Sequence, residues 1–174
     1  MKRLLAVICC LALCSAPALA KTRHAPGAAM TDQQFVDFAA QTDMVEANLG
    51  QLAQNVGASQ QVKDYGQMLA TDHTQDYQSL QSVAQQINLN VPGAIDAKNN
   101  KTVIGPFHAL QGAAFDRRFV PAMVAGHTKA IAIYTKEAAD AQNAALRTYA
   151  QNALPVLEKH LNAAKALEHG KAPK

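Results

Sequence analysis

The chain has 174 residues, a formal net charge of +3 and 49% hydrophobic residues, with no tryptophan. This length is enough for one domain with a sizeable core. The nearly balanced charge, with no basic block or basic-aromatic stripe, argues against nucleic acid as a partner.

The N-terminus has the three parts of a secretory signal peptide. Lys2 and Arg3 provide the positive end, and the apolar run at 4–13 is too short to span a bilayer as a helix. The small residues of Ala18-Leu19-Ala20 provide a cleavage site. We therefore expect residues 1–20 to be removed, and the mature protein to begin at Lys21 in the periplasm, without a transmembrane segment.

All three cysteines lie inside this signal, at Cys9, Cys10 and Cys14. The mature chain then has no thiol, which excludes a disulfide framework, a thiolate metal site and a cysteine nucleophile. Residues 21–30 (KTRHAPGAAM) are expected to form a flexible lead.

The first helix is predicted to begin after Thr31. Thr31 and Gln34 have the spacing of a capping box, and Gly57 ends the helix. Apolar or small residues recur at alternating spacings of three and four, which is typical of a helix in a bundle. The predicted buried seam consists of Phe35, Phe38, Thr42, Val45, Leu49, Leu52 and Val56.

The second helix is predicted to be capped by Ser59 and to run to about Ile87. Its seam is apolar at both ends, but His73 and Asp76 occupy the middle. Residues 88–111 then form a long connection, which we expect to contain a short helix after Asp96.

Two more helices are predicted at about 113–139 and 144–168, followed by a disordered tail at 169–174. The first has His127 on its seam and the second has His160. Pro121 and Pro155 fall inside these helices, where proline removes a backbone hydrogen bond and favours a kink or a local restart. The sequence thus predicts an all-α, antiparallel four-helix bundle over 31–168, with a long connection between helices 2 and 3.

A weak internal repeat suggests that the bundle consists of two related hairpins. The segment VKDYGQ at 62–67 resembles LRTYAQ at 146–151, with a tyrosine and a glutamine in the same places. Aligning the two segments places His160 over Asp76, one helical turn from His73. We therefore expect a pseudo-twofold axis, with the polar residues of both halves facing it.

Four longer segments carry a family resemblance. They are AQTDMVEANLGQLA, MLATDHTQ, GAAFDRRFVPAMVAGH and LPVLEKHL. Together they resemble the bacterial domain-of-unknown-function family numbered 4142, whose members are exported and are grouped with the ferritin-like four-helix bundles. The resemblance implies that fold and a periplasmic location, but no established activity. The polar positions of the family fall on Glu46, Asp72, His73, His127 and His160.

Three helices each place a histidine on a seam and the first helix places Glu46 beside its seam, which predicts a site inside the bundle. Neutral imidazoles and a carboxylate are ligands for Zn, Cu or Fe, and bundle cores can hold such sites. One hypothesis is therefore a single metal ion bound by His73, His127, His160 and Glu46. Asp72 or Asp76 would then orient an imidazole by a hydrogen bond.

The other hypothesis is a closed polar network without metal, in which each histidine is paired with a neighbouring acid. The protein would then be a structural, interaction or stress-related protein of the cell envelope. No Glu-x-x-His motif is present, which argues against a ferritin-type di-iron centre. No nucleophile elbow, zinc-protease motif or phosphate loop occurs either, so an enzymatic activity is not evident.

Overall fold

The structure is a computed structural model that describes residues 30–170. The predicted signal peptide and its cleavage site lie outside this range. So do nearly all of the predicted flexible lead and most of the predicted disordered tail.

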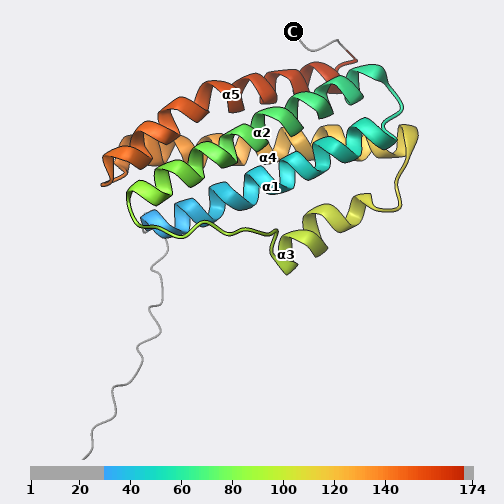
Figure 1. Ribbon diagram of the computed structural model, residues 1–174. Helices are drawn as coiled ribbons and strands as arrows, with labels where there is room; N and C mark the ends of the chain where they lie inside the picture. The colour runs from blue at the N-terminus through green and yellow to red at the C-terminus, as the bar shows by residue number, and fades with distance from the viewer. Residues whose placement is uncertain (1–29, 171–174) are drawn as a thin grey trace, which may run out of the picture.

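Four long helices form an antiparallel bundle (Figure 1). They are α1 (Asp32–Val56), α2 (Gln60–Gln86), α4 (Gly112–Asp140) and α5 (Ala144–Glu168). The connection from α2 to α4 contains α3 (Ala97–Asn99), the π-helix η1 (Asn100–Ile104) and the 3₁₀-helix η2 (Gly105–Phe107). The described range contains no β-strand, only an isolated bridge between Gly57 and Gly112. The predicted all-α bundle, with its long connection, is confirmed.

Local sequence signals set the beginnings of α1 and α2. The Thr31 hydroxyl accepts a hydrogen bond from the backbone of Gln34, whose side chain accepts one from the backbone of Thr31. The Ser59 side chain accepts one from the backbone of Val62. These caps satisfy backbone groups that a helix end leaves without partners. Neither Pro121 nor Pro155 ends its helix, so the local restart considered from the sequence does not occur.

A close approach of α1 and α2 corrects the predicted seam of the first helix. A Cβ atom on Gly66 would lie 2.6 Å from the carbonyl oxygen of Gly50, so only glycine fits there. This contact turns the small residues of α1 inward, and Phe38, Thr42, Leu52 and Val56 become only partly buried. The buried residues of α1 are Phe35, Val36, Ala39, Ala40, Asp43, Val45, Glu46, Leu49, Gly50 and Ala53.

Two exchanged hydrogen bonds between α2 and α5 agree with the predicted internal repeat. The Tyr65 hydroxyl donates to the backbone carbonyl of His160 at 3.2 Å. The Tyr149 hydroxyl donates to Oδ2 of Asp76 at 2.7 Å. Tyr149 is the repeat equivalent of Tyr65, and His160 that of Asp76. Each tyrosine therefore bonds the helix of the other half at the equivalent level.

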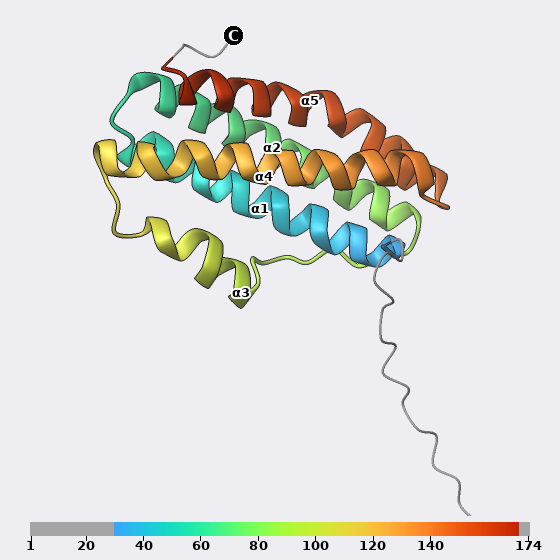
Figure 2. The same cartoon turned by 180° about the vertical axis from the view of Figure 1, so that it is seen from behind.

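The apolar core is divided into two clusters, with a polar layer between them. One cluster, towards the α1–α2 turn, includes Leu49, Leu69 and Phe119. The other, towards the opposite end, includes Phe35, Tyr134 and Leu146. The segment from α3 to η2 lies along the outside of α1 and α4 (Figure 2). Among the described helices, none is long and apolar enough to cross a bilayer.

Candidate metal centre

Three helices each bring one histidine to the middle of the bundle: His73 from α2, His127 from α4 and His160 from α5. One ring nitrogen of each lies within 4.8 Å of the other two. The ring centroids form a nearly equilateral triangle, with sides of 5.8, 5.1 and 5.2 Å. The side chains are 2%, 1% and 0% exposed. The structure thus brings together three of the four side chains that the sequence predicts to converge, His73, His127 and His160.

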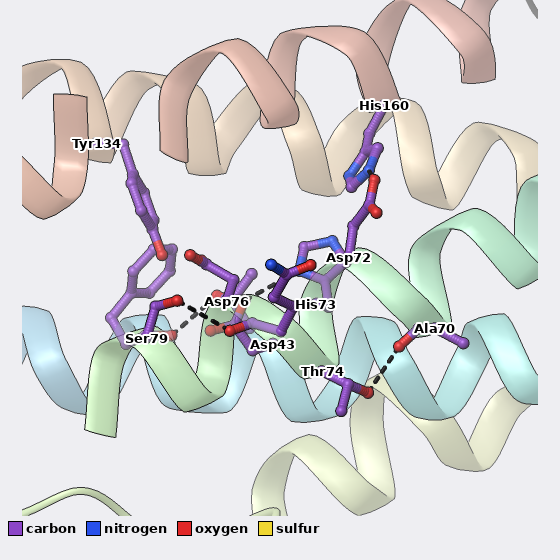
Figure 3. A network of polar contacts seen from close by, with 12 residues as sticks. Asp43, Ala70, Asp72, His73, Thr74, Asp76, Ser79, Tyr134 and His160 are labelled. Atoms are coloured by element: carbon purple, nitrogen blue, oxygen red, sulfur yellow. Dashed lines mark hydrogen bonds and ion pairs between the residues drawn. The ribbon is translucent and has the colours of Figure 1, made fainter. Parts of the chain in front are cut away.

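Each imidazole is held from outside the triangle by an acceptor. Nδ1 of His73 lies 2.9 Å from Oδ1 of Asp43, and Nε2 of His160 lies 2.9 Å from Oδ2 of Asp72 (Figure 3). Nδ1 of His127 lies 2.9 Å from the backbone carbonyl oxygen of Met123. Such contacts fix the orientation and the tautomer of an imidazole.

The inner ring nitrogens have no hydrogen-bond partner among the described residues. They are Nε2 of His73, Nε2 of His127 and Nδ1 of His160, and all three are buried. A carbonyl oxygen only accepts hydrogen bonds, so in the neutral ring of His127 the proton is on Nδ1 and the lone pair is on Nε2. The same follows for His73 and His160 when their aspartates are ionised. Three lone pairs then converge on one buried point, an arrangement that a cation would satisfy.

The spacing of these nitrogens fits one metal ion. Imidazole nitrogens bind Zn²⁺ at about 2.0–2.1 Å, so nitrogens around one ion of this size are at most about 4 Å apart. The observed upper limit of 4.8 Å is close to this value. Small movements of the side chains would therefore complete the coordination.

Burial keeps the imidazoles of His73 and His160 in the neutral form that binds metals. It lowers the pKa of His73 well below the usual value, and the neighbouring His160 and His127 lower it further. Burial also lowers the pKa of His160 to about 4, although the hydrogen bond to Asp72 opposes this shift. Metal uptake at neutral pH therefore needs no deprotonation of these two rings.

The structure places Glu46 beside the triangle but not within it. The possible ligand atoms that lie within 4.8 Å of one another come from the three histidines, and no oxygen of Glu46 is among them. Oε1 of Glu46 lies 3.0 Å from where a Cβ atom on residue 126 would be, so Gly126 leaves room for this carboxylate. Burial raises the pKa of Glu46, and His127 lowers it. Glu46 thus adds a buried acidic group near the imidazoles.

Asp43 is a buried residue of the histidine cluster that was not predicted from the sequence. It is 1% exposed, and its Oδ2 atom has no partner in the described part of the chain. Burial raises its pKa well above the usual range, and the nearby Asp76 and Glu46 raise it further. A signal was present, because Asp43 precedes Glu46 by three residues and therefore lies on the same helix face.

The two acids that were expected to orient an imidazole differ in their contacts. Asp72 holds His160, as expected, and also pairs with Nζ of Lys159 at 3.3 Å. Asp76 instead accepts the hydrogen bond from Tyr149, so it orients a phenol and not an imidazole. The imidazole of His73 takes its acceptor from α1.

These features define the class of protein, which is an all-α bundle with a buried cluster of three histidines. The sequence profile of the family described as "Domain of unknown function (DUF4142)" matches residues 17–167, and the chain belongs to this family. No protein of curated function matches the chain.

Several solved structures share the fold. CopM in its Cu(I)-bound form aligns with a TM-score of 0.68 and 15% identity, over 81% of this chain and 97% of CopM. The Cu(II)-bound form gives 0.68 and 14%, over 82% and 99%. The apo form gives 0.63 and 15%, over 81% and 98%. At this level of identity the likeness establishes a common fold.

Proposed function

We propose that this protein binds one copper ion between His73, His127 and His160, as a metal-binding protein of the periplasm. The observation that carries the proposal is the convergence of three buried ring nitrogens without partners. Neutral lone pairs so close together are unfavourable unless a cation lies between them. The predicted export signal supports the location.

The chemistry of the site favours copper among the metals considered. Imidazole nitrogens suit Zn, Cu, Fe and Ni, and the affinity of divalent first-row metals peaks at Cu²⁺. The centre has three imidazoles and no carboxylate within the same close spacing. As further support, CopM, which shares the fold, has been solved with Cu(I), Cu(II) and Ag bound.

The hydrogen bonds around the centre also argue against the hypothesis of a closed structural network without metal. A closed network would pair the inner nitrogens, but five buried side-chain atoms in and around the centre lack partners within the described residues. They are Oδ2 of Asp43, Oε2 of Glu46, Nε2 of His73, Nε2 of His127 and Nδ1 of His160. A bound cation would use the three nitrogens and stabilise both carboxylates.

The test is a copper titration of the mature protein, stripped with a chelator, with Zn²⁺ as competitor. We expect one copper ion per chain, no binding by His127→Leu, and displacement of Zn²⁺ by Cu²⁺. His108→Leu is the matched control, because His108 is exposed in the connection. The proposal would be contradicted if the parent protein bound no copper, or if the parent and His127→Leu bound copper equally.

A further inference from the structure

The position of the centre restricts how an ion can reach it. The apolar cluster of Leu49, Leu69 and Phe119 lies on one side along the bundle axis, and that of Phe35 and Tyr134 on the other. A hydrated ion crossing either cluster would lose its water in apolar surroundings, at a high free-energy cost. The ion must therefore arrive from the side, between two helices.

The side between α1 and α4 is poorly suited to a cation. The segment from α3 to η2 covers it and leaves two small cavities of about 210 and 220 Å³ beside Glu46. Lys129 lines one of these cavities and Arg118 lines the other. Their positive charges would repel an approaching metal ion.

The side between α2 and α5 is more acidic and more open to the histidines. A groove of about 680 Å³ lies between these helices, and both His73 and His160 line it. Asp72 and Asp76 add two carboxylates to its wall, against the single positive charge of Lys159. The inner ring nitrogens of these two histidines are buried behind this wall and have no partner among the described residues, so the groove ends beside two of the candidate ligands.

We propose that the groove between α2 and α5 is a loading site, where a hydrated divalent copper ion binds to the carboxylates of Asp72 and Asp76 before it passes to His160 and His73. This inference rests on the proposed copper binding. Carboxylate oxygens hold hydrated divalent ions, whereas imidazoles bind the ion once water has left. Lys159 is half-exposed in its ion pair with Asp72, and such surface pairs are weak enough for an incoming cation to displace.

Two exposed valines provide a matched test by stopped-flow measurement of Cu²⁺ uptake and release. Val156 lines the groove and is 39% exposed, and Val103 lies over the cavities between α1 and α4 and is 38% exposed. Val156→Trp should slow both uptake and release by about tenfold and leave the Kd unchanged, because it obstructs the route and not the end states. Val103→Trp should behave like the parent.

A second pair of variants tests the electrostatic part without adding bulk. Asp76→Asn should slow Cu²⁺ uptake severalfold at low ionic strength and less at high salt, because it removes a negative charge from the groove. The control is Asp64→Asn on the exposed face of the same helix. Circular dichroism checks that each variant is folded, and the asparagine pair decides the question if Val156→Trp is not.

The outcomes separate the two proposals. If the parent binds copper but Val156→Trp takes it up at the parental rate, or Val103→Trp is the slower variant, the loading site is wrong and the metal centre stands. Equal uptake rates for Asp76→Asn and Asp64→Asn would also overturn it. If the parent binds no copper at equilibrium, both proposals fail.

Discussion

Nδ1 of His73 on α2 lies 2.9 Å from Oδ1 of Asp43 on α1, and both side chains are buried. The contact joins two helices and turns Nε2 of His73 towards His127 and His160. A carboxylate that accepts the outer proton of an imidazole makes its other nitrogen a better metal ligand. Asp43 therefore belongs to the centre, although it does not line the triangle.

Asp43→Asn should weaken copper binding by about 10–100-fold, the range for loss of such a supporting carboxylate. The amide keeps the size of the side chain but loses the charge that favours a bound cation. The control is Asp37→Asn, because Asp37 is exposed on the same helix. Competition with a chelator of known affinity gives both values, and equal affinities would exclude a role for Asp43.

His127→Leu distinguishes the metal centre from a metal-free network through stability. Without metal, the variant should lose no more than about 1 kcal/mol of unfolding free energy, because it gives up only the hydrogen bond from Nδ1 to the backbone carbonyl of Met123, while Nε2 has no partner to lose. A closed network instead predicts a loss of about 1–3 kcal/mol.

With copper at a hundredfold excess over Kd, the parent alone should gain about 2.7 kcal/mol. Urea unfolding with chelator and with copper measures both effects. A variant that is strongly destabilised in chelator, with no gain for the parent in copper, would support the network.

His160 predicts a loss of stability in acid when no metal is present. Its pKa is about 4 in the folded protein, against a usual value of 6.5. The unfolded chain therefore takes up a proton that the native state does not bind, and stability falls as the pH drops from 6.5 towards 4. The full effect is about 3 kcal/mol at 1.36 kcal/mol per pKa unit.

His160→Gln should remove this part of the pH dependence. Unfolding free energies of the parent and the variant, measured at several pH values in chelator, give the difference directly. Parallel pH profiles between 6.5 and 4 would show that His160 is not held neutral by burial.

Glu46→Gln tests whether Glu46 is a ligand or only a nearby charge. Because Glu46 lies outside the close set of histidine nitrogens, the variant should lose about tenfold or less of its affinity for copper. This loss is well below the loss expected for a missing histidine. The raised pKa of Glu46 also favours the folded state at low pH, and this contribution is lost as the pH rises through the raised value. The apo variant should therefore gain stability over the parent as the pH rises. A loss of affinity as large as that of His127→Leu would make Glu46 a ligand.

The sequence predicted the parts of the fold that depend on local signals. The caps at Thr31 and Ser59 and the breaks between helices involve neighbouring residues, so they could be read directly. The three histidines could be found because each interrupts an otherwise apolar seam.

The face of α1 could not be predicted, because it depends on the tertiary contact of Gly50 with Gly66. Hydrophobic periodicity gives little weight to buried glycines and alanines, so the predicted seam favoured Phe38. This error left Asp43 off the buried face. The partner of Asp76 was missed for a related reason, since Tyr149 reaches it from another helix.

The most direct test of the copper centre is a crystal structure of the mature protein with copper, measured at the copper absorption edge. A copper ion bound in the triangle predicts one strong anomalous peak per chain, at about 2 Å from Nε2 of His73, Nε2 of His127 and Nδ1 of His160. A peak elsewhere, or an empty triangle in crystals grown with excess copper, would contradict it.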